Sequence, residues 1–120
     1  MRDIARVLAA AADPHRLAML GLLSRQGQLC VCDIQAVLGI SQSSASRHLR
    51  TLREAGLLED ERVGSWVHYR IPPRPGRAQA AILAAIEGLL GPEHLAALDD
   101  KARERRRGTC LPGAPAEVGP

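Results

Sequence analysis

Residues Leu29–Glu61, LCVCDIQAVLGISQSSASRHLRTLREAGLLEDE, contain two short helical segments that meet at a glycine. The first helix is expected over Cys32–Leu38, where apolar residues recur once per turn. Gly39 should end it, because glycine adopts the left-handed conformation without the steric cost of a side chain. The second helix is expected to follow an N-cap at Ser41 and to run to about Ala55. Two helices joined by so tight a turn predict a helix-turn-helix unit.

The two faces of the second helix differ in a way that favours nucleic-acid binding. Ala45, Leu49 and Leu52 form an apolar stripe that should face the core. The opposite face has small polar side chains at its start, then arginines, and no acid before Glu54. Small polar groups can reach base edges in a major groove while guanidinium groups meet phosphates. An ordinary solvated helix is the alternative, although such helices usually mix acids and bases. The residues of this face that we predict to contact DNA are Gln42, Ser43, Ser44, Ser46, Arg47, His48 and Arg50.

The segment that follows this helix is typical of a β-hairpin. Residues 57–71 are expected to form two strands around a turn at Val63–Ser65, and the second strand alternates in polarity from Trp66 to Ile71. A helix-turn-helix followed by a hairpin is a winged helix. Near the tip of the wing we predict contacts with the phosphate backbone, although plain hairpin surface is an equal alternative for each residue. The candidates are Arg62, Ser65 and His68.

The motifs LCVCDI and LGISQSSASRHLRTLREAGLL, followed by the hairpin, resemble the ArsR/SmtB family of metal-responsive repressors. The match covers roughly Leu17–Ile71. The resemblance implies a dimeric winged helix-turn-helix, mostly α with a β-hairpin wing, that binds a roughly palindromic operator in double-stranded DNA. The Cys-Val-Cys-Asp sequence resembles the arsenic-sensing and the cadmium/lead-sensing branches. In this family the helix expected over Arg77–Leu90 pairs with its twin across a two-fold axis.

Composition fits one small domain that is completed by dimerisation. The 120 residues include no Phe, one Trp and one Tyr, so the core must be aliphatic. Small helical units of this kind often complete their cores by forming dimers. The formal net charge is only +3, but three arginines of the second helix place positive charge at the expected DNA reader. We expect a single domain over residues 1–107 and a flexible C-terminal tail over 108–120, where Pro and Gly are frequent.

Further helices are expected on both sides of the helix-turn-helix. Asp13 should cap a helix that starts at Pro14, where the missing amide costs nothing. After a rigid Pro-rich break, helices are expected over Arg77–Leu90 and Glu93–Arg107. Asp3–Ala12 should be a short amphipathic helix. Its apolar side is formed by Ile4, Val7, Leu8 and Ala11.

The start of the chain and the cysteine count bear on the compartment. Met1–Ala12 carries charged residues and is too short to span a bilayer, so we expect a cytoplasmic protein with no membrane partner. In a reducing compartment, three cysteines favour free thiols and metal or redox chemistry over a disulfide framework.

Cys30 and Cys32 are the candidate ligands for a soft ion. Residues at this spacing point to the same side of an extended segment but lie about 200° apart on a helix. Both sulfurs can therefore bind one ion only if the start of the helix is extended or distorted. A position near a helix N-terminus is expected to lower the thiol pKa, which favours the thiolate that a metal needs. Thiolates select soft, thiophilic ions.

The resemblance to the arsenic-sensing branch implies trivalent arsenic, which favours three thiolates, whereas zinc and cadmium prefer four ligands. That branch often has a third cysteine three residues after the second, but here the position is Gln35. We hypothesise that Cys110, from the same or the partner subunit, completes the site; the alternative is that Cys110 is incidental. Asp33 is expected to cap the helix. The Asp-x-His pair of the zinc-sensing branch does not occur in the sequence, and His94 alone does not replace it.

The leading prediction is a homodimeric DNA-binding repressor, without enzymatic activity or an organic cofactor, that As(III) or Sb(III) releases from its operator through Cys30, Cys32 and Cys110. Within the same fold, the alternative is a sensor of Cd(II) or Pb(II), or a thiol-redox switch. A thiol enzyme such as an arsenate reductase would need an anion-binding Cys-x5-Arg loop, which the sequence lacks. A winged helix that serves only protein contacts would show no salt-dependent DNA affinity.

Overall fold

The helix-turn-helix forms where the sequence predicts it. In the computed structural model, which describes residues 1–108, α3 (Val31–Leu38) and α4 (Gln42–Glu54) meet at Gly39. Gly39 lies in the left-handed region, at φ 68° and ψ 34°, which confirms it as the C-cap of α3. The Ser41 side chain accepts a hydrogen bond from the backbone amide of Ser44 at 3.1 Å, which confirms the predicted N-cap of α4. The two caps fix where the turn begins and ends.

The wing belongs to a three-stranded antiparallel sheet with the strand order β1-β3-β2. β2 (Glu59–Val63) and β3 (Trp66–Arg70) form the predicted hairpin, with Gly64 at φ 67° in its turn. β1 (Gln28–Cys30) adds a strand that the sequence analysis did not predict, because three residues are too few to show alternation. The register places Cys30 opposite His68 of β3. β1 therefore joins the start of α3 to the wing.

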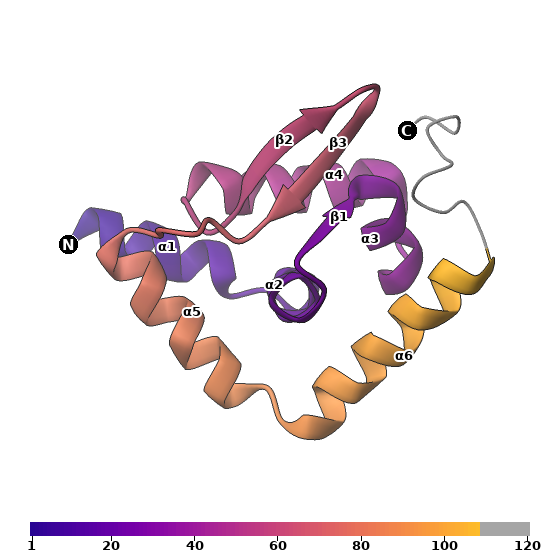
Figure 1. Cartoon of the computed structure of the whole chain (residues 1–120). Helices are drawn as coiled ribbons and strands as arrows, with labels where there is room; N and C mark the ends of the chain where they lie inside the picture. The colour runs from indigo at the N-terminus through magenta and orange to yellow at the C-terminus, as the bar shows by residue number, and fades with distance from the viewer. Residues whose placement is uncertain (109–120) are drawn as a thin grey trace.

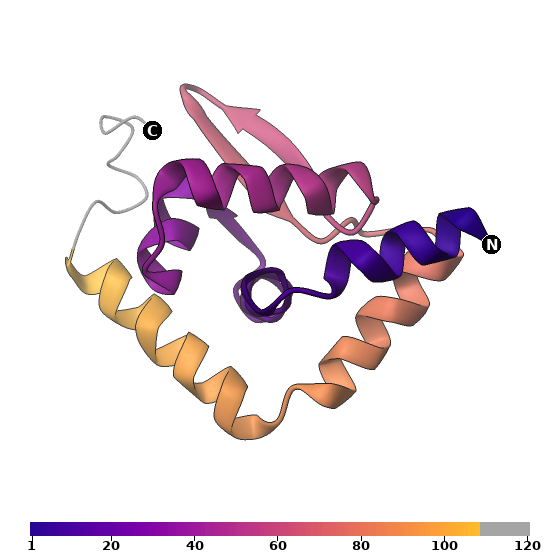
Figure 2. The same ribbon diagram turned by 180° about the vertical axis from the view of Figure 1, so that it is seen from behind.

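Four further helices complete the fold: α1 (Arg2–Ala11), α2 (Pro14–Gln26), α5 (Arg77–Leu89) and α6 (Pro92–Gly108). Figures 1 and 2 show α2 end-on at the centre, with the other elements around it and with α5 and α6 as the two arms of a V. Among residues 1–108, no single helix is both long and apolar enough to cross a membrane; only α5 and α6 taken together meet that criterion, as a pair bent by 95°.

The core is aliphatic, as the composition predicts, and α2 supplies its centre. Two aromatic side chains of β3 join it, Trp66 at 9% exposed and Tyr69 at 6%. From α4 the predicted stripe of Ala45, Leu49 and Leu52 is fully buried. The largest fully buried side chains are Met19, Leu20, Leu22, Leu23, Ile34, Leu49, Leu52, Leu57 and Leu58. Burying one face of α4 in this way leaves its polar face outward.

The apolar side of α1 is only partly buried. Val7 and Ala11 are buried, but Ile4 is 48% exposed and Leu8 is 52% exposed. The two exposed side chains border a shallow apolar groove between α1 and α5. It is lined by Ile4, Leu8, Arg77, Ala78, Ala81 and Ile82. An open apolar face on two adjacent helices is a surface that the expected dimer would cover.

Candidate nucleic-acid interface and thiol site

The predicted DNA-contacting side chains of α4 are mostly on the surface. Gln42, Ser43, Arg47 and Arg50 are exposed, whereas Ser44, Ser46 and His48 are half-buried. Among the side chains that the structure describes, Arg47 and Arg50 form no ion pair. Two guanidinium groups and two small polar groups therefore face outward from one helix, an arrangement that can meet phosphates and base edges.

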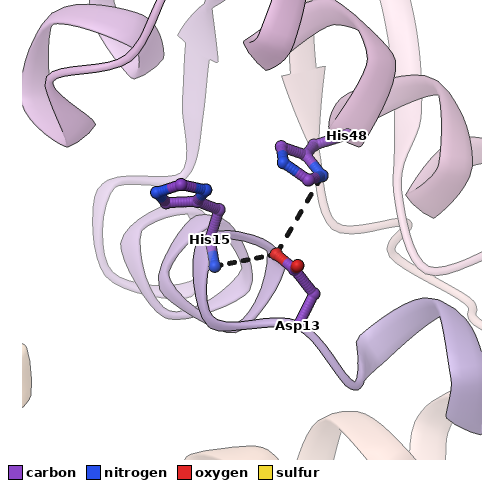
Figure 3. Close-up of side chains that lie close together, drawn as sticks. All are labelled: Asp13, His15 and His48. Atoms are coloured by element: carbon purple, nitrogen blue, oxygen red, sulfur yellow. Dashed lines mark hydrogen bonds and ion pairs between the residues drawn. The ribbon is translucent and has the colours of Figure 1, made fainter.

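His48 lies differently from the other members of this set, because its ring faces α2. Its Nδ1 lies 2.9 Å from a guanidinium nitrogen of Arg16, and the His15 and His48 ring centroids are 5.5 Å apart. Figure 3 shows the His15 and His48 rings close to the Asp13 carboxylate. Partial burial, with the nearby Arg16, lowers the pKa of His48, and Asp13 opposes this shift. His48 thus forms a contact between helices, and a DNA contact for it stays a prediction.

The wing carries three acidic residues that arginines neutralise. Arg70 of β3 pairs with Glu59 at 2.6 Å and with Glu61 at 3.1 Å, and Arg53 of α4 pairs with Asp60 at 3.0 Å. Unpaired carboxylates at these positions would repel a phosphate backbone. The sequence alone does not reveal this role, because the pairs join residues that only the hairpin and the helix packing bring together.

The three candidate wing residues are spread along the hairpin. Arg62 and Ser65 are exposed near its tip. His68 lies nearer the middle of β3, opposite Cys30 and Glu61, and its Nδ1 lies 3.1 Å from the side-chain nitrogen of Gln28. Arg62 and Ser65 are therefore placed as expected, whereas His68 is further from the tip than the sequence analysis placed it.

Cys30 and Cys32 meet in one network of side chains at the start of α3. Cys30 is the N-cap, with extended backbone at φ −81° and ψ 161°, and the helix begins at the next residue. Its thiol donates to Asp33 Oδ2 at 3.4 Å. Arg105 of α6 donates to Asp33 Oδ1 at 2.9 Å and to Cys32 Sγ at 3.0 Å. Cys30 therefore lies on extended backbone, whereas Cys32 lies within the first turn of α3, so the binding of one ion by both sulfurs stays a prediction.

The protonation of Cys30 differs from the sequence-based expectation. Burial, above all, raises the pKa of the Cys30 thiol to about 11, and the carboxylate of Asp33 and the neighbouring Cys32 add to this shift. The backbone amide of Asp33 acts in the opposite direction but does not outweigh burial. The prediction that helix-terminal position lowers the thiol pKa is therefore wrong for Cys30, which is only 9% exposed.

Asp33 was expected to cap α3, but its side chain forms no capping hydrogen bond. Its carboxylate bonds the Cys30 thiol and Arg105 instead. The side chains of Asp33 and Arg105 are only 15% and 19% exposed, so this ion pair is largely shielded from water. Arg105 could not be found from sequence, because 72 positions separate it from Asp33. Cys110, the predicted third ligand, lies outside the described residues.

Comparison with known proteins identifies the family and supports the fold. Residues 13–60 match the family model described as "bacterial regulatory protein, arsR family". The chain is also similar to the structure of a homodimeric winged helix-turn-helix DNA-binding domain from Mycobacterium bovis, with a TM-score of 0.63 and 34% identity. That similarity covers 73% of this chain and 78% of the other. The chain belongs to the ArsR family. Its winged helix-turn-helix fold is that of the family.

Two similar ArsR-family relatives have arsenic in their names. An arsenic resistance transcriptional regulator of Pseudomonas putida is 44% identical over 80 residues, which is 67% of this chain and 62% of the relative. The arsenical resistance operon repressor of Escherichia coli is 55% identical over 62 residues, or 52% of this chain and 53% of the relative. This ArsR-family chain thus matches a little over half the length of each.

Proposed function

We propose that this protein is a homodimeric, DNA-binding transcriptional repressor that leaves a roughly palindromic operator when trivalent arsenic or antimony binds its thiols. The observation that carries the proposal is the position of the thiol network, at the junction of the wing sheet, α3 and α6. The names of the similar regulators from P. putida and E. coli support arsenic as the inducer.

Few contacts separate the thiols at this junction from the elements that are predicted to contact DNA, so ion binding can affect both. Cys30 belongs to β1, which pairs with β3 of the wing, and Cys32 belongs to α3, which packs on α4. A hollow of about 330 Å³ is lined by Cys32 together with Ser46 and Arg50 of α4 and Trp66 of the wing. Drawing both sulfurs onto one ion would strain the start of α3 against both elements. A coupling free energy of about 1–3 kcal/mol would change DNA affinity by about 5–150-fold.

Arsenous acid can react with a thiol that is protonated at neutral pH. Each thiol that binds replaces one hydroxide on arsenic, and the thiol proton leaves with that hydroxide as water. Cys30 can therefore react although its pKa is raised to about 11. When Cys32 sulfur bonds to arsenic, Arg105 loses a hydrogen-bond acceptor, so ligation is also transmitted to α6.

The course of α6 supports Cys110 as the third ligand from the same subunit. Arg105 already contacts Cys32, and Cys110 follows five positions later in the sequence. α6 continues to Gly108, so the first three of these positions rise only about 1.5 Å each, and the last two add at most about 7 Å. Chain length therefore allows Cys110 to reach the thiol pair without help from a partner subunit.

The test is the fluorescence anisotropy of a labelled palindromic duplex, selected by the protein from a random library. The reduced protein is bound to the duplex, and arsenite is then added to wild type, Cys32→Ser and Cys110→Ser. We expect arsenite to release wild type and to consume three thiols per chain, as counted by a thiol-reactive dye. Cys32→Ser should bind the duplex but resist release. Release of Cys110→Ser at the wild-type arsenite concentration would remove Cys110 from the site.

Other outcomes would show that a different inducer acts or that the whole proposal is wrong. If arsenite leaves wild type on the duplex while Cd(II), Pb(II) or peroxide releases it, the protein is the alternative sensor with the same fold. If no selected duplex binds with an affinity that falls as salt is raised, the DNA-binding proposal itself is wrong.

A further inference from the structure

A second group of metal-binding side chains lies where the start of α2 meets α4, and it shares no residue with the thiol network. We infer that Asp13, His15 and His48 form a binding site for a borderline divalent cation such as Zn²⁺. One ligand atom from each of the three lies within 4.8 Å of the others. Figure 3 shows the three side chains close together where the two helices meet.

The donor set determines the class of ion. Two imidazole nitrogens and one carboxylate oxygen are ligands that Zn²⁺ accepts, with water in the fourth tetrahedral position. Imidazole also suits Co²⁺, Ni²⁺ and Cu²⁺, whereas thiophilic ions prefer sulfur. Trivalent arsenic needs thiolates and should not bind at this site, whereas Zn²⁺ accepts both imidazole and thiolate ligands.

The geometry needs only a small contraction. With metal–ligand bonds of about 2.0–2.1 Å, tetrahedral ligand atoms are about 3.4 Å apart. His15 is exposed, so its ring can rotate toward His48 without disturbing the core. Asp13 Oδ2 accepts the capping bonds from the amides of His15 at 2.9 Å and Arg16 at 3.1 Å. Neither capping bond uses Oδ1, so this oxygen can bind an ion while α2 stays capped.

A cationic group, the guanidinium of Arg16, lies beside these ligands. The Arg16 guanidinium contacts His48 Nδ1 at 2.9 Å, and because a guanidinium only donates, Nδ1 must be the unprotonated nitrogen. An unprotonated nitrogen is what a metal ion needs. Arg16 can release His48 and still hold the carbonyl of Ala10 through its Nε at 2.6 Å.

An ion at this site would join the start of α2 to α4, the helix expected to enter the DNA groove. Ion binding there would therefore give the protein a second way to change its DNA binding, one that does not depend on its thiols. The chain also offers a matched control. His94 is an exposed histidine 3.8 Å from the Glu93 carboxylate, but it lacks a third ligand nearby in the described structure.

The experiment follows the imidazole ¹⁵N resonances of the four histidines in the reduced, full-length protein during titration with Zn²⁺ alone. We expect the ring nitrogens of His15 and His48 to shift together, whereas those of His94 stay in place. His15→Ala should weaken this binding by more than about 10-fold, since loss of even an outer-shell partner costs that much. His94→Ala should bind like wild type.

Thermal unfolding in Zn²⁺ provides a second readout. The upward shift of Tm should be smaller for His15→Ala than for wild type and unchanged for His94→Ala. Two results would overturn the inference. One is a titration in which the His15 and His48 resonances do not move. The other is a His15→Ala variant that binds Zn²⁺ with wild-type affinity through any combination of the remaining side chains.

Discussion

Replacing Arg105 with methionine should reduce the free energy of unfolding by about 1–3 kcal/mol. Arg105 holds Asp33 at 2.9 Å and Cys32 Sγ at 3.0 Å, and the side chains of Arg105 and Asp33 are 19% and 15% exposed. Breaking a fully buried ion pair costs about 3–5 kcal/mol, whereas an exposed pair contributes about 0–1 kcal/mol. A pair that retains a little solvent lies between these limits. Methionine keeps most of the apolar stem, so the loss reports the guanidinium and not the packing.

The assay is urea unfolding followed by circular dichroism, at one fixed protein concentration because dimerisation would contribute to stability. Arg105→Met, Asp33→Asn and the double variant form a cycle, and their coupling should exceed about 0.5 kcal/mol. Arg103→Met is the matched control on the same helix, since its pair with Asp100 is 59% and 67% exposed. A loss for Arg105→Met no larger than that for Arg103→Met, with additive effects in the cycle, would refute the reasoning.

Three further predictions concern single residues. Because the pKa of Cys30 is raised to about 11 from an ordinary 9.0, the folded state holds this proton more tightly than the unfolded state. The stabilisation that results is present below pH 9 and should be lost between about pH 9 and 11. Midpoints of urea unfolding measured across this pH range would show the loss. Gly39→Ala should lower the free energy of unfolding by about 1–2 kcal/mol, because φ is 68° and the left-handed conformation is unfavourable for alanine. Calorimetry would measure this loss. Arg47→Ala should reduce the salt slope of DNA binding by about 1, whereas Ser65→Ala should leave the slope unchanged.

The parts of the fold that sequence predicts are those that local chemistry decides. Asp13, Gly39 and Ser41 each act through backbone groups a few residues away, so their caps could be read directly from the chain. The stripe of α4 follows from helical spacing alone. The position of the two cysteines beside the helix-turn-helix was predicted for the same reason, since they immediately precede it in the sequence.

The parts that were missed depend on contacts between distant segments. β1 is a strand only because β3 is beside it, and the pKa of Cys30 is raised because the fold buries a thiol that its local sequence would leave exposed. Arg105 reaches Cys32 and Asp33 from the far end of α6. None of these contacts leaves a periodic or capping signal in the sequence.

The paired acids of the wing yield a prediction in which a residue affects DNA binding without a DNA contact. Arg70→Gln would leave Glu59 and Glu61 without their guanidinium partner, so a DNA backbone near β2 would meet two uncompensated carboxylates. DNA affinity should fall severalfold at low salt, and the difference should shrink as added salt shortens the Debye length from about 10 Å at 0.1 M to 3 Å at 1 M.

A compensating change separates this mechanism from a loss of fold or of a direct contact. Adding Glu61→Gln to Arg70→Gln removes one of the exposed carboxylates and should recover part of the lost affinity. If Arg70 instead donated to a phosphate, Glu61→Gln would change DNA affinity by the same factor with and without Arg70, because the two effects would be independent. Anisotropy titrations of the four proteins in the Arg70 and Glu61 cycle, at two salt concentrations, distinguish the two cases. Recovery limited to low salt is the signature of repulsion, because only the charge term is screened.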